Sequence, residues 1–365
     1  MREAGRGLLA AAAAVLAMTV VAAAGLALLG AGDPGALTAA VVALAVGGTA
    51  EVGAVPAAGL PVAVRGSLHV LPLGVSLAGA AVLGWVLLRG GAHGLLVRGA
   101  AAAVALPAGL GAFALAAQGK LPLPDGVATG GCVRSGGSAR LPVSGALDAG
   151  FSVAAGPAVV GALTGTLAVL GTCWVIARFP TRTRGLRAVG WLAGGLTVLC
   201  LTLAWAFGGP TTAGAVLLVL PQLVSGVLLL GLGVPWTVTT TGPLPCAPDL
   251  PPGGPASWVA AVVLLACGVA VRSRRPGTPV RRAVASSVRF APAAGAVLAV
   301  VTLLSRISLD VTVGAFGLSL PVFAVRLAAD PLLALVAGLA GGAVAGFAGS
   351  LLADGISVSS RVWKR

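Results

Sequence analysis

Charged residues are scarce in this chain: they make up 9% of its 365 residues, and it contains no tyrosine and two histidines. A soluble domain carries about 25% charged residues, so the composition excludes a soluble globular protein. The chain is instead 58% hydrophobic, with 56 glycines and a mean hydropathy of +1.05. Apolar runs of about 20 residues are long enough to cross a bilayer. The sequence therefore predicts a multi-pass integral membrane protein.

The chain also lacks the short motifs of common enzyme sites. His69 and His93 are too far apart for an HExxH zinc helix. Lys120 follows a glycine but precedes Leu121, which excludes a phosphate-binding loop. The nearest approach to a nucleophile elbow, residues 74–78, lacks the last glycine. We therefore expect no enzyme activity, no metal site and no cofactor.

Apolar runs predict an all-α fold, a polytopic transmembrane bundle of ten helical elements. Eight runs are expected to cross the membrane: Leu8–Gly30, Val70–Leu88, Gly99–Ala117, Phe151–Ala177, Ala188–Phe207, Ser257–Val271, Ala291–Leu304 and Pro331–Leu352. Two more are interrupted by glycine, proline or polar residues, namely Ala36–Leu60 and Thr211–Val234. These two segments either cross the bilayer or re-enter it.

The net charge of +14 comes from arginine clusters between the apolar runs. This distribution is typical of loops held on the cytoplasmic side of a membrane, and it argues against nucleic-acid binding. More basic residues lie inside if neither interrupted segment crosses than if both do. The favoured topology has eight crossings, both termini in the cytoplasm and basic inner loops near anionic lipid.

Two short phrases recur at a fixed distance along the chain. Residues 6–8 (RGL) recur at 184–186, and residues 19–20 (TV) recur at 197–198. Fixed-offset similarity indicates an internal duplication, although chance matching in a chain so rich in Ala, Gly, Leu and Val is the alternative. Residues 1–178 and 179–365 are then two membrane repeats, each with a span, an interrupted segment and three more spans.

The paired interruptions indicate a candidate solute or ion site. Broken helices at membrane depth persist where protein shields them or where they line a wet cavity, and paired ones point to a transport site. The candidate residues are Gly47, Gly48, Glu51, Pro221, Gln222 and Ser225. The alternative for Glu51 is a position near the outer interface, where it is in water or paired with Arg65. The alternative for Gln222 and Ser225 is to replace helix hydrogen bonds lost at the proline.

Cysteine and small residues give two further expectations. Cys132 and Cys246 lie in Pro/Gly-rich loops that the eight-crossing topology places outside, where a disulfide between them would persist. The last span carries a small residue every fourth position, a pattern that lets helices pack closely within one chain or in a homo-oligomer. These residues are Gly338, Gly342, Gly346 and Ser350.

Two acid and base pairs near the C-terminal end are spaced four residues apart, namely Arg306 with Asp310 and Arg326 with Asp330. Side chains at this spacing meet on one face of a helix. We therefore expect surface ion pairs on helical turns of the outer loop.

Three phrases resemble a known family. They are Gly35–Gly48 (GALTAAVVALAVGG), Leu71–Gly84 (LPLGVSLAGAAVLG) and Gly231–Trp236 (GLGVPW). They are similar to the streptophobe family, hydrophobic integral membrane proteins of Streptomyces and relatives. The resemblance covers most of the chain and implies a multi-pass protein of a bacterial plasma membrane. It implies no catalytic residue.

The sequence thus favours a transporter- or permease-like protein that binds or moves an unknown small solute between its halves. The alternative is a non-catalytic membrane scaffold or envelope-associated component. The glycine stripe and the scarcity of buried polar groups favour that alternative.

Overall fold

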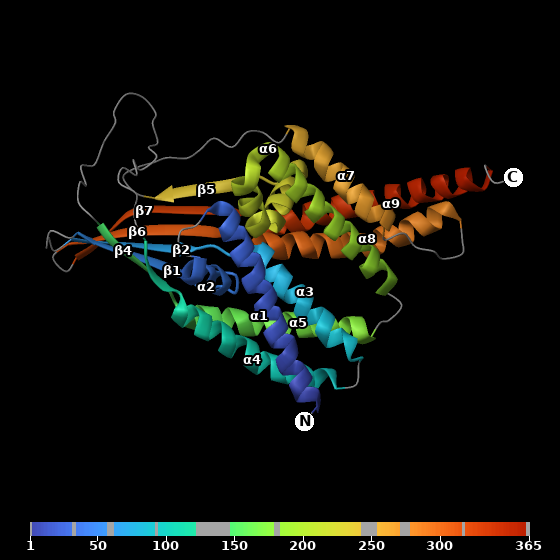
Figure 1. The fold of residues 1–365 in the computed structure, drawn as a ribbon. Helices are drawn as coiled ribbons and strands as arrows, with labels where there is room; N and C mark the ends of the chain where they lie inside the picture. The colour runs from blue at the N-terminus through green and yellow to red at the C-terminus, as the bar shows by residue number, and fades with distance from the viewer. Residues whose placement is uncertain are drawn as a thin grey trace.

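The computed structural model describes residues 2–30, 34–56, 62–91, 94–121, 147–178, 183–241, 254–270, 278–315 and 318–362. Within them the chain forms nine helices and seven strands (Figure 1). The predicted helical bundle is confirmed, but the prediction of ten helical elements and no sheet is wrong.

The first half of the chain alternates helix pairs with strand pairs. Its elements are α1 (Arg2–Leu29), α2 (Pro34–Leu44), β1 (Ala50–Pro56), β2 (Val62–His69), α3 (Leu73–Arg89), α4 (Leu95–Ala116), β3 (Gln118–Leu121), β4 (Leu147–Val153) and α5 (Ala155–Arg178).

The second half contains α6 (Thr183–Gly231), β5 (Trp236–Thr241), α7 (Gly254–Ala270), α8 (Pro279–Leu304), β6 (Ile307–Ala315), β7 (Leu318–Ala329) and α9 (Pro331–Val362). Helix α6 contains a sharp kink at Gly209, whose φ of 74° is readily adopted by glycine. The expected elements Ala188–Phe207 and Thr211–Val234 are two helical segments that meet at the non-helical Gly209, and they count together as the single element α6 among the nine helices.

Six helices are long and apolar enough to cross a membrane. They are α1, α4, α5, the Gly194–Gly231 part of α6, α8 and the Pro331–Asp354 part of α9. Helices α3 and α7 are apolar but shorter, and so is α2. Large apolar side chains such as Leu9, Val104 and Leu332 are well exposed on these helices. Such a surface suits lipid, because lipid tails are as apolar as the side chains.

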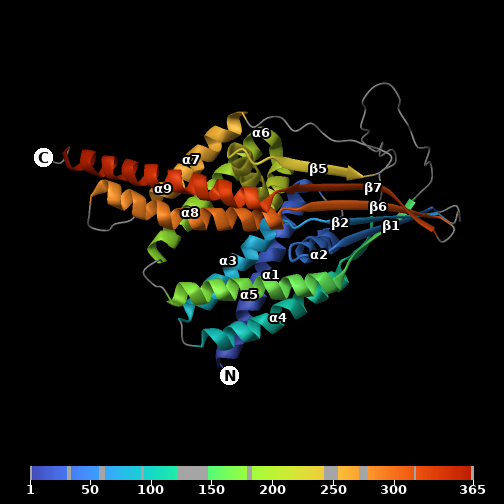
Figure 2. The ribbon, with the colours of Figure 1, turned by 180° about the vertical axis from the view of Figure 1, so that it is seen from behind.

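The seven strands form one antiparallel sheet in the order β3-β4-β1-β2-β6-β7-β5. Strands β2 and β6 join the two halves, with Arg65 opposite Thr312. Most strands follow or precede a helix within one to three residues. The sheet leaves the helices at one end of the molecule, as the front and back views show (Figures 1 and 2).

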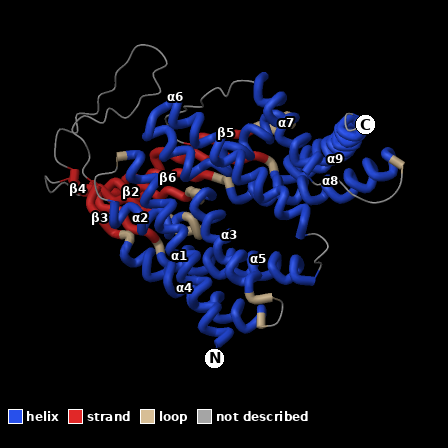
Figure 3. Tube along the Cα trace, turned by 45° about the vertical axis from the view of Figure 1, so that its right-hand side comes forward, coloured by secondary structure: helices blue, strands red, loops and turns tan. Residues whose placement is uncertain are grey.

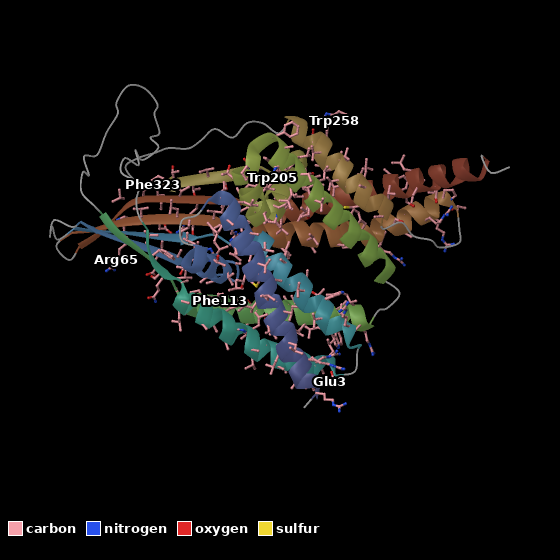
Figure 4. The ribbon with its side chains drawn as sticks, in the orientation of Figure 1. Glu3, Arg65, Phe113, Trp205, Trp258 and Phe323 are labelled. Carbon is pink, nitrogen blue, oxygen red and sulfur yellow. The ribbon has the colours of Figure 1, made fainter. Side chains whose placement is uncertain are left out.

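The two faces of the sheet differ in polarity. One row of paired residues consists of Val153, Ala50, Leu68, Leu309, Val325 and Thr240. The adjacent row consists of Gln118, Ser152, Glu51, Ser67, Asp310, Ala324 and Thr241. Successive residues of a strand point to opposite faces, so the first row marks an apolar face and the second a polar face. Figure 4 labels Phe323, on the apolar face, and Arg65, on the polar face.

The predicted helical ion pairs near the C-terminal end are wrong, because the residues lie in or beside strands. Asp310 lies within β6 and Arg326 within β7. Residues four apart on a strand are about 13 Å from one another, too far for an ion pair. Asp330 instead caps α9, since its Oδ1 accepts a hydrogen bond of 2.8 Å from the Leu332 N–H.

The apolar core has three parts. The largest lies among α1, α3, α4 and α5, with Leu87 and Leu110 fully buried. A second lies where α2, α4 and α5 meet the base of β1 and β4, and a third where α6, α8 and α9 meet β7. The strands thus extend directly from packed helices, and the strands lie together on one side of the helices in Figure 3.

Candidate functional site

The interrupted segment of the first half ends in a tight turn. Gly47 has a φ of 99°, and its N–H donates to the Leu44 carbonyl over 2.9 Å. The Gly48 N–H donates to the Ala43 carbonyl over 3.0 Å. This is a Schellman-type ending, which favours glycine at the position with positive φ. The turn reverses the chain, which then leaves as β1.

The interrupted segment of the second half ends in the same way. Gly233 has a φ of 79°, and its N–H donates to the Leu230 carbonyl over 3.1 Å. The Val234 N–H donates to the Leu229 carbonyl over 2.9 Å. The chain again reverses and leaves as β5. Both segments therefore return the chain to the same sheet.

The beginning of α3 is hydrogen-bonded to both segments. The Ser76 hydroxyl donates to the Ala45 carbonyl, at the end of α2, over 2.5 Å. The Gln222 Nε2 of α6 donates to the Leu71 carbonyl just before α3. The interrupted segments of the two halves are therefore hydrogen-bonded to the same helix end, and we call this region the seam.

Glycines bring the helices into backbone contact at the seam. A Cβ atom at Gly74 would collide with the backbone of Leu217 and Leu218 in α6. A Cβ at Gly214 would lie 2.6 Å from the Gly25 carbonyl oxygen of α1. Larger residues at these positions would force α6 away from α1 and α3.

Gln222 has an unused acceptor at the seam. Its Oε1 is buried and has no hydrogen-bond partner. Ser225 is buried beside it and donates to the Gln222 backbone carbonyl over 3.0 Å. A buried acceptor without a donor costs about 1–3 kcal/mol, so this oxygen favours a species that brings a donor or a positive charge.

The predicted site residues are only partly brought together. Pro221, Gln222 and Ser225 lie at the seam, and Gly47 and Gly48 form the turn that Ser76 joins to it through Ala45. Glu51 instead lies exposed on the polar face of the sheet, opposite Ser67 and Ser152.

Sequence reasoning missed Ser76 and Gly74. Both fall in the expected span Val70–Leu88, where the sequence analysis assigned neither residue to a site. A hydroxyl and a glycine at the start of an apolar span were the available signal, because small and hydroxyl residues mark contacts between membrane helices.

The glycine stripe of the last span lies against α8. A Cβ at Gly338 would be 2.8 Å from the Gly295 Cα, and Gly342 and Gly346 have similarly close neighbours in α8. Ser350 is buried at the end of the stripe. The stripe therefore packs within the chain.

The remaining predictions concern metals and disulfides. The described residues contain no group of three or more His, Cys, Asp or Glu side chains that could hold a metal ion. Cys132 and Cys246 lie outside the described residues, so the disulfide between them stays a prediction. The described cysteines, Cys173, Cys200 and Cys267, are free thiols.

Comparisons with known proteins give no relative: no family model, no curated protein and no solved structure matches the chain. The functional argument therefore depends on the geometry of the seam and of the sheet.

Proposed function

We propose that the chain is an integral protein of a bacterial plasma membrane that crosses it eight times, with both termini in the cytoplasm. The single sheet supports this topology. Its strands come from four connections: between α2 and α3, α4 and α5, α6 and α7, and α8 and α9. An open sheet edge is not tolerated in hydrocarbon, so all four connections lie on one side of the membrane. Neither α2 nor the second part of α6 then crosses.

Tryptophans support the same placement. Trp205 and Trp258 are exposed near the sheet end of the helices, as Figure 4 shows. Trp85 and Trp174 are exposed near the opposite end, where the Arg89 guanidinium lies 3.5 Å from the Trp85 ring centre. Indole rings favour both interfaces of a bilayer, and arginine favours the cytoplasmic one.

Cysteine labelling tests the topology. Single cysteines at Ser67, Gln118, Thr239 and Arg326, one for each connection, are introduced after replacing the native cysteines. All four are expected to react with an impermeant maleimide in intact cells, because one sheet cannot lie on two sides of a membrane. A cysteine at Thr278, at the other end of the bundle, should react only after lysis. If any of the four cysteines reacts only after lysis while another reacts in intact cells, the proposed topology is wrong.

We also infer that residues 1–178 and 179–365 are two parallel copies of one unit. The strand order supports this, since β3-β4-β1 in the first half corresponds to β6-β7-β5 in the second. Helix contacts support it too: a Cβ at Gly111 would meet Val159 of α5, and a Cβ at Gly295 would meet Leu335 of α9. Parallel repeats with a site between them are one of the known transporter arrangements.

On this basis the protein is a transporter- or permease-like carrier of a small solute, and the seam is its site. The observation that carries the proposal is the buried, unused Gln222 Oε1 at the contact between the halves. The solute that fits is small and supplies a hydrogen-bond donor or a positive charge to that oxygen.

A comparison of metabolites tests the seam. A strain lacking the gene is compared with the parent by untargeted mass spectrometry of cells and medium, and is then complemented with variants. Gln222→Ala is expected to leave the altered metabolite at its deletion level, because the site loses its acceptor. Gln118→Ala, on the edge strand β3, is the matched control and should restore the parental level. Both variants must reach the membrane in equal amounts. Full restoration of the parental metabolite level by Gln222→Ala would contradict the proposal that the seam is the solute site.

The projecting sheet favours one second candidate, a scaffold or envelope-associated component. A sheet extending beyond the helices offers a binding surface that a simple channel does not need (Figure 2). A deletion strain with unchanged metabolites but altered envelope composition would support the scaffold over the carrier.

A further inference from the structure

The two edge strands of the sheet differ in how well they are protected from pairing. β3 has four residues and carries Lys120, and short strands and lysines are common means of protecting an edge. β5 has six residues, WTVTTT, with no charge, no proline and no glycine. Among the described strands it pairs only with β7. β5 therefore offers an open row of backbone N–H and C=O groups, which is a template for a further strand.

The β5 side chains leave this edge accessible. The Thr237 hydroxyl donates to the Ala328 carbonyl of β7 over 2.8 Å, and the Thr239 hydroxyl donates to the Arg326 carbonyl over 3.5 Å. Both hydroxyls therefore lean toward β7 and away from the open edge. Thr237, Thr239 and Thr241 are all exposed, so no described helix covers this part of the strand.

β5 has a counterpart in the first half of the chain, with the same register. Ala50 of β1 lies three residues after the positive-φ glycine of its turn and pairs with Val153, two residues before α5. Trp236 of β5 lies three residues after the positive-φ glycine of its own turn and pairs with Ala329, two residues before α9. β5 and β7 therefore correspond to β1 and β4 residue by residue.

The first half also shows what the corresponding edge binds. The other side of β1 is occupied by β2, which pairs antiparallel with Ala50 opposite Leu68 and Glu51 opposite Ser67. β2 runs back toward the helices and leads into α3. Among the described residues, no strand takes the equivalent place beside β5.

We propose that the open edge of β5 binds an extended segment of another protein on the outer side of the membrane, antiparallel to β5, as β2 binds β1. This inference rests on the proposed repeats and on the proposed outer position of the sheet, but not on transport at the seam. Addition of a strand to an exposed sheet edge is a common mode of peptide recognition. β5 has half-buried Trp236 and Val238 on one face and exposed threonines on the other. The segment that fits therefore alternates apolar and polar residues.

A second copy of the chain does not fit this edge directly. Every pair of neighbouring strands is antiparallel, so β3 and β5, which are six strands apart, run in the same direction. Both follow a helix and run away from it, so copies in one membrane would bring these edges together in parallel. The sequence that follows β5, residues 242–253, contains five prolines, which lack the N–H that a strand ladder uses. A segment of a separate protein fits better than either.

A peptide with the sequence of β2 tests the edge. The probe is VAVRGSLH, residues 62–69, with Ser67→Cys, and the full-length protein carries Thr237→Cys as its only cysteine. The protein is placed in nanodiscs of equal parts phosphatidylcholine and phosphatidylglycerol. Under mild oxidation we expect a disulfide between peptide and protein, because the register of β1 with β2 places these positions opposite each other. Thr241→Cys, on the same face but about 13 Å along β5, is the matched control and should give at least about tenfold less adduct.

Moving the peptide cysteine reverses the expected preference. With Ala63→Cys in the peptide, the antiparallel register predicts more adduct with Thr241→Cys than with Thr237→Cys. Both protein cysteines must react equally with a small maleimide, so that any difference comes from the position of the peptide. Equal adducts, a preference that does not reverse, or no adduct would overturn the proposal. The topology and the carrier site would still stand, because their tests do not depend on the edge of β5.

Photo-crosslinking in intact cells identifies the natural occupant. Benzoylphenylalanine at Thr237 is expected to give an adduct with a segment of another protein. The same group at Thr241 should attach to the same segment, four residues nearer its N-terminus, because the pairing is antiparallel. A crosslinked dimer would mean that a second copy binds the edge, and a crosslink within the chain would mean that the protein covers its own edge. Either result, or the absence of any adduct, would overturn the proposal.

Discussion

Replacing Arg98 by alanine is expected to destabilise the protein by about 3 kcal/mol. Arg98 is 1% exposed, and its Nη2 donates to the Gly91 carbonyl over 2.5 Å. Its Nε lies 3.3 Å from the Glu3 Oε2 and 3.4 Å from the Gly94 carbonyl. Alanine would leave a cavity, remove the side-chain donor to the Gly91 carbonyl and leave the Glu3 Oε2 without its cationic partner. Thermal unfolding of the purified protein in detergent measures the loss as a lower midpoint.

Arg6→Ala is the matched control for this variant. Arg6 lies 2.8 Å from the other oxygen of Glu3, but its side chain is 60% exposed. Exposed ion pairs contribute about 0–1 kcal/mol, so this variant should unfold near the wild-type temperature. Equal midpoints for the two variants would mean that the buried arginine has no special role at this end of the bundle.

Gly338→Leu is expected to lower the free energy of unfolding by about 3 kcal/mol or more, because the leucine side chain would separate α8 from α9. The new side chain would start 2.8 Å from the Gly295 Cα and 3.1 Å from the Ala294 carbonyl oxygen. Neither is the flexible end of a side chain, so the helices themselves must move apart. Size-exclusion chromatography after detergent extraction, followed by thermal unfolding, measures the effect as less monodisperse protein and a lower midpoint.

Ala340→Leu provides the control in the same helix. Ala340 is exposed, so the added side chain would point toward lipid. Surface substitutions away from special features usually change stability by less than about 0.5 kcal/mol. If Gly338→Leu were as stable as Ala340→Leu, the close contact between α8 and α9 would not hold the second half together.

The helices were predictable because one physical requirement dominates them. A segment that crosses a bilayer must be apolar and about 20 residues long, and runs such as Leu8–Gly30 and Pro331–Leu352 meet both conditions. Their ends were less predictable. The run Phe151–Ala177 begins in β4 and continues as α5, since the residues of both elements are apolar.

The sheet was missed because its strands lie between the apolar runs or at their ends, and the sequence analysis interpreted them as loops or as parts of spans. The signal was nevertheless present in the segment WTVTTT of β5, whose β-branched residues alternate between half-buried and exposed. The long pairing between β2 and β6 had no local signal, because sequence patterns do not indicate which distant strands meet. For the same reason the buried contacts of Arg98 could not be inferred, because the sequence shows only a basic residue at the inner end of a span.

The seam was predictable only in part. Pro221 and Gln222 interrupt an apolar run, and that interruption indicated the correct part of α6. Their partners could not be inferred, because Ser76 and Leu71 lie in an ordinary apolar stretch far away along the chain.

The junction of β2 with β6 also determines the order in which the protein can be completed. The Thr312 hydroxyl donates to the Arg65 carbonyl over 3.3 Å, across 247 residues of chain. At about 5–20 residues per second, a ribosome needs about 10–50 s to make that length. During this time β2 presents an unpaired edge while six more helices, α3 to α8, are made and inserted. An exposed edge is a template for pairing with another chain, so the newly made first half is the stage at which two copies would most readily exchange strands.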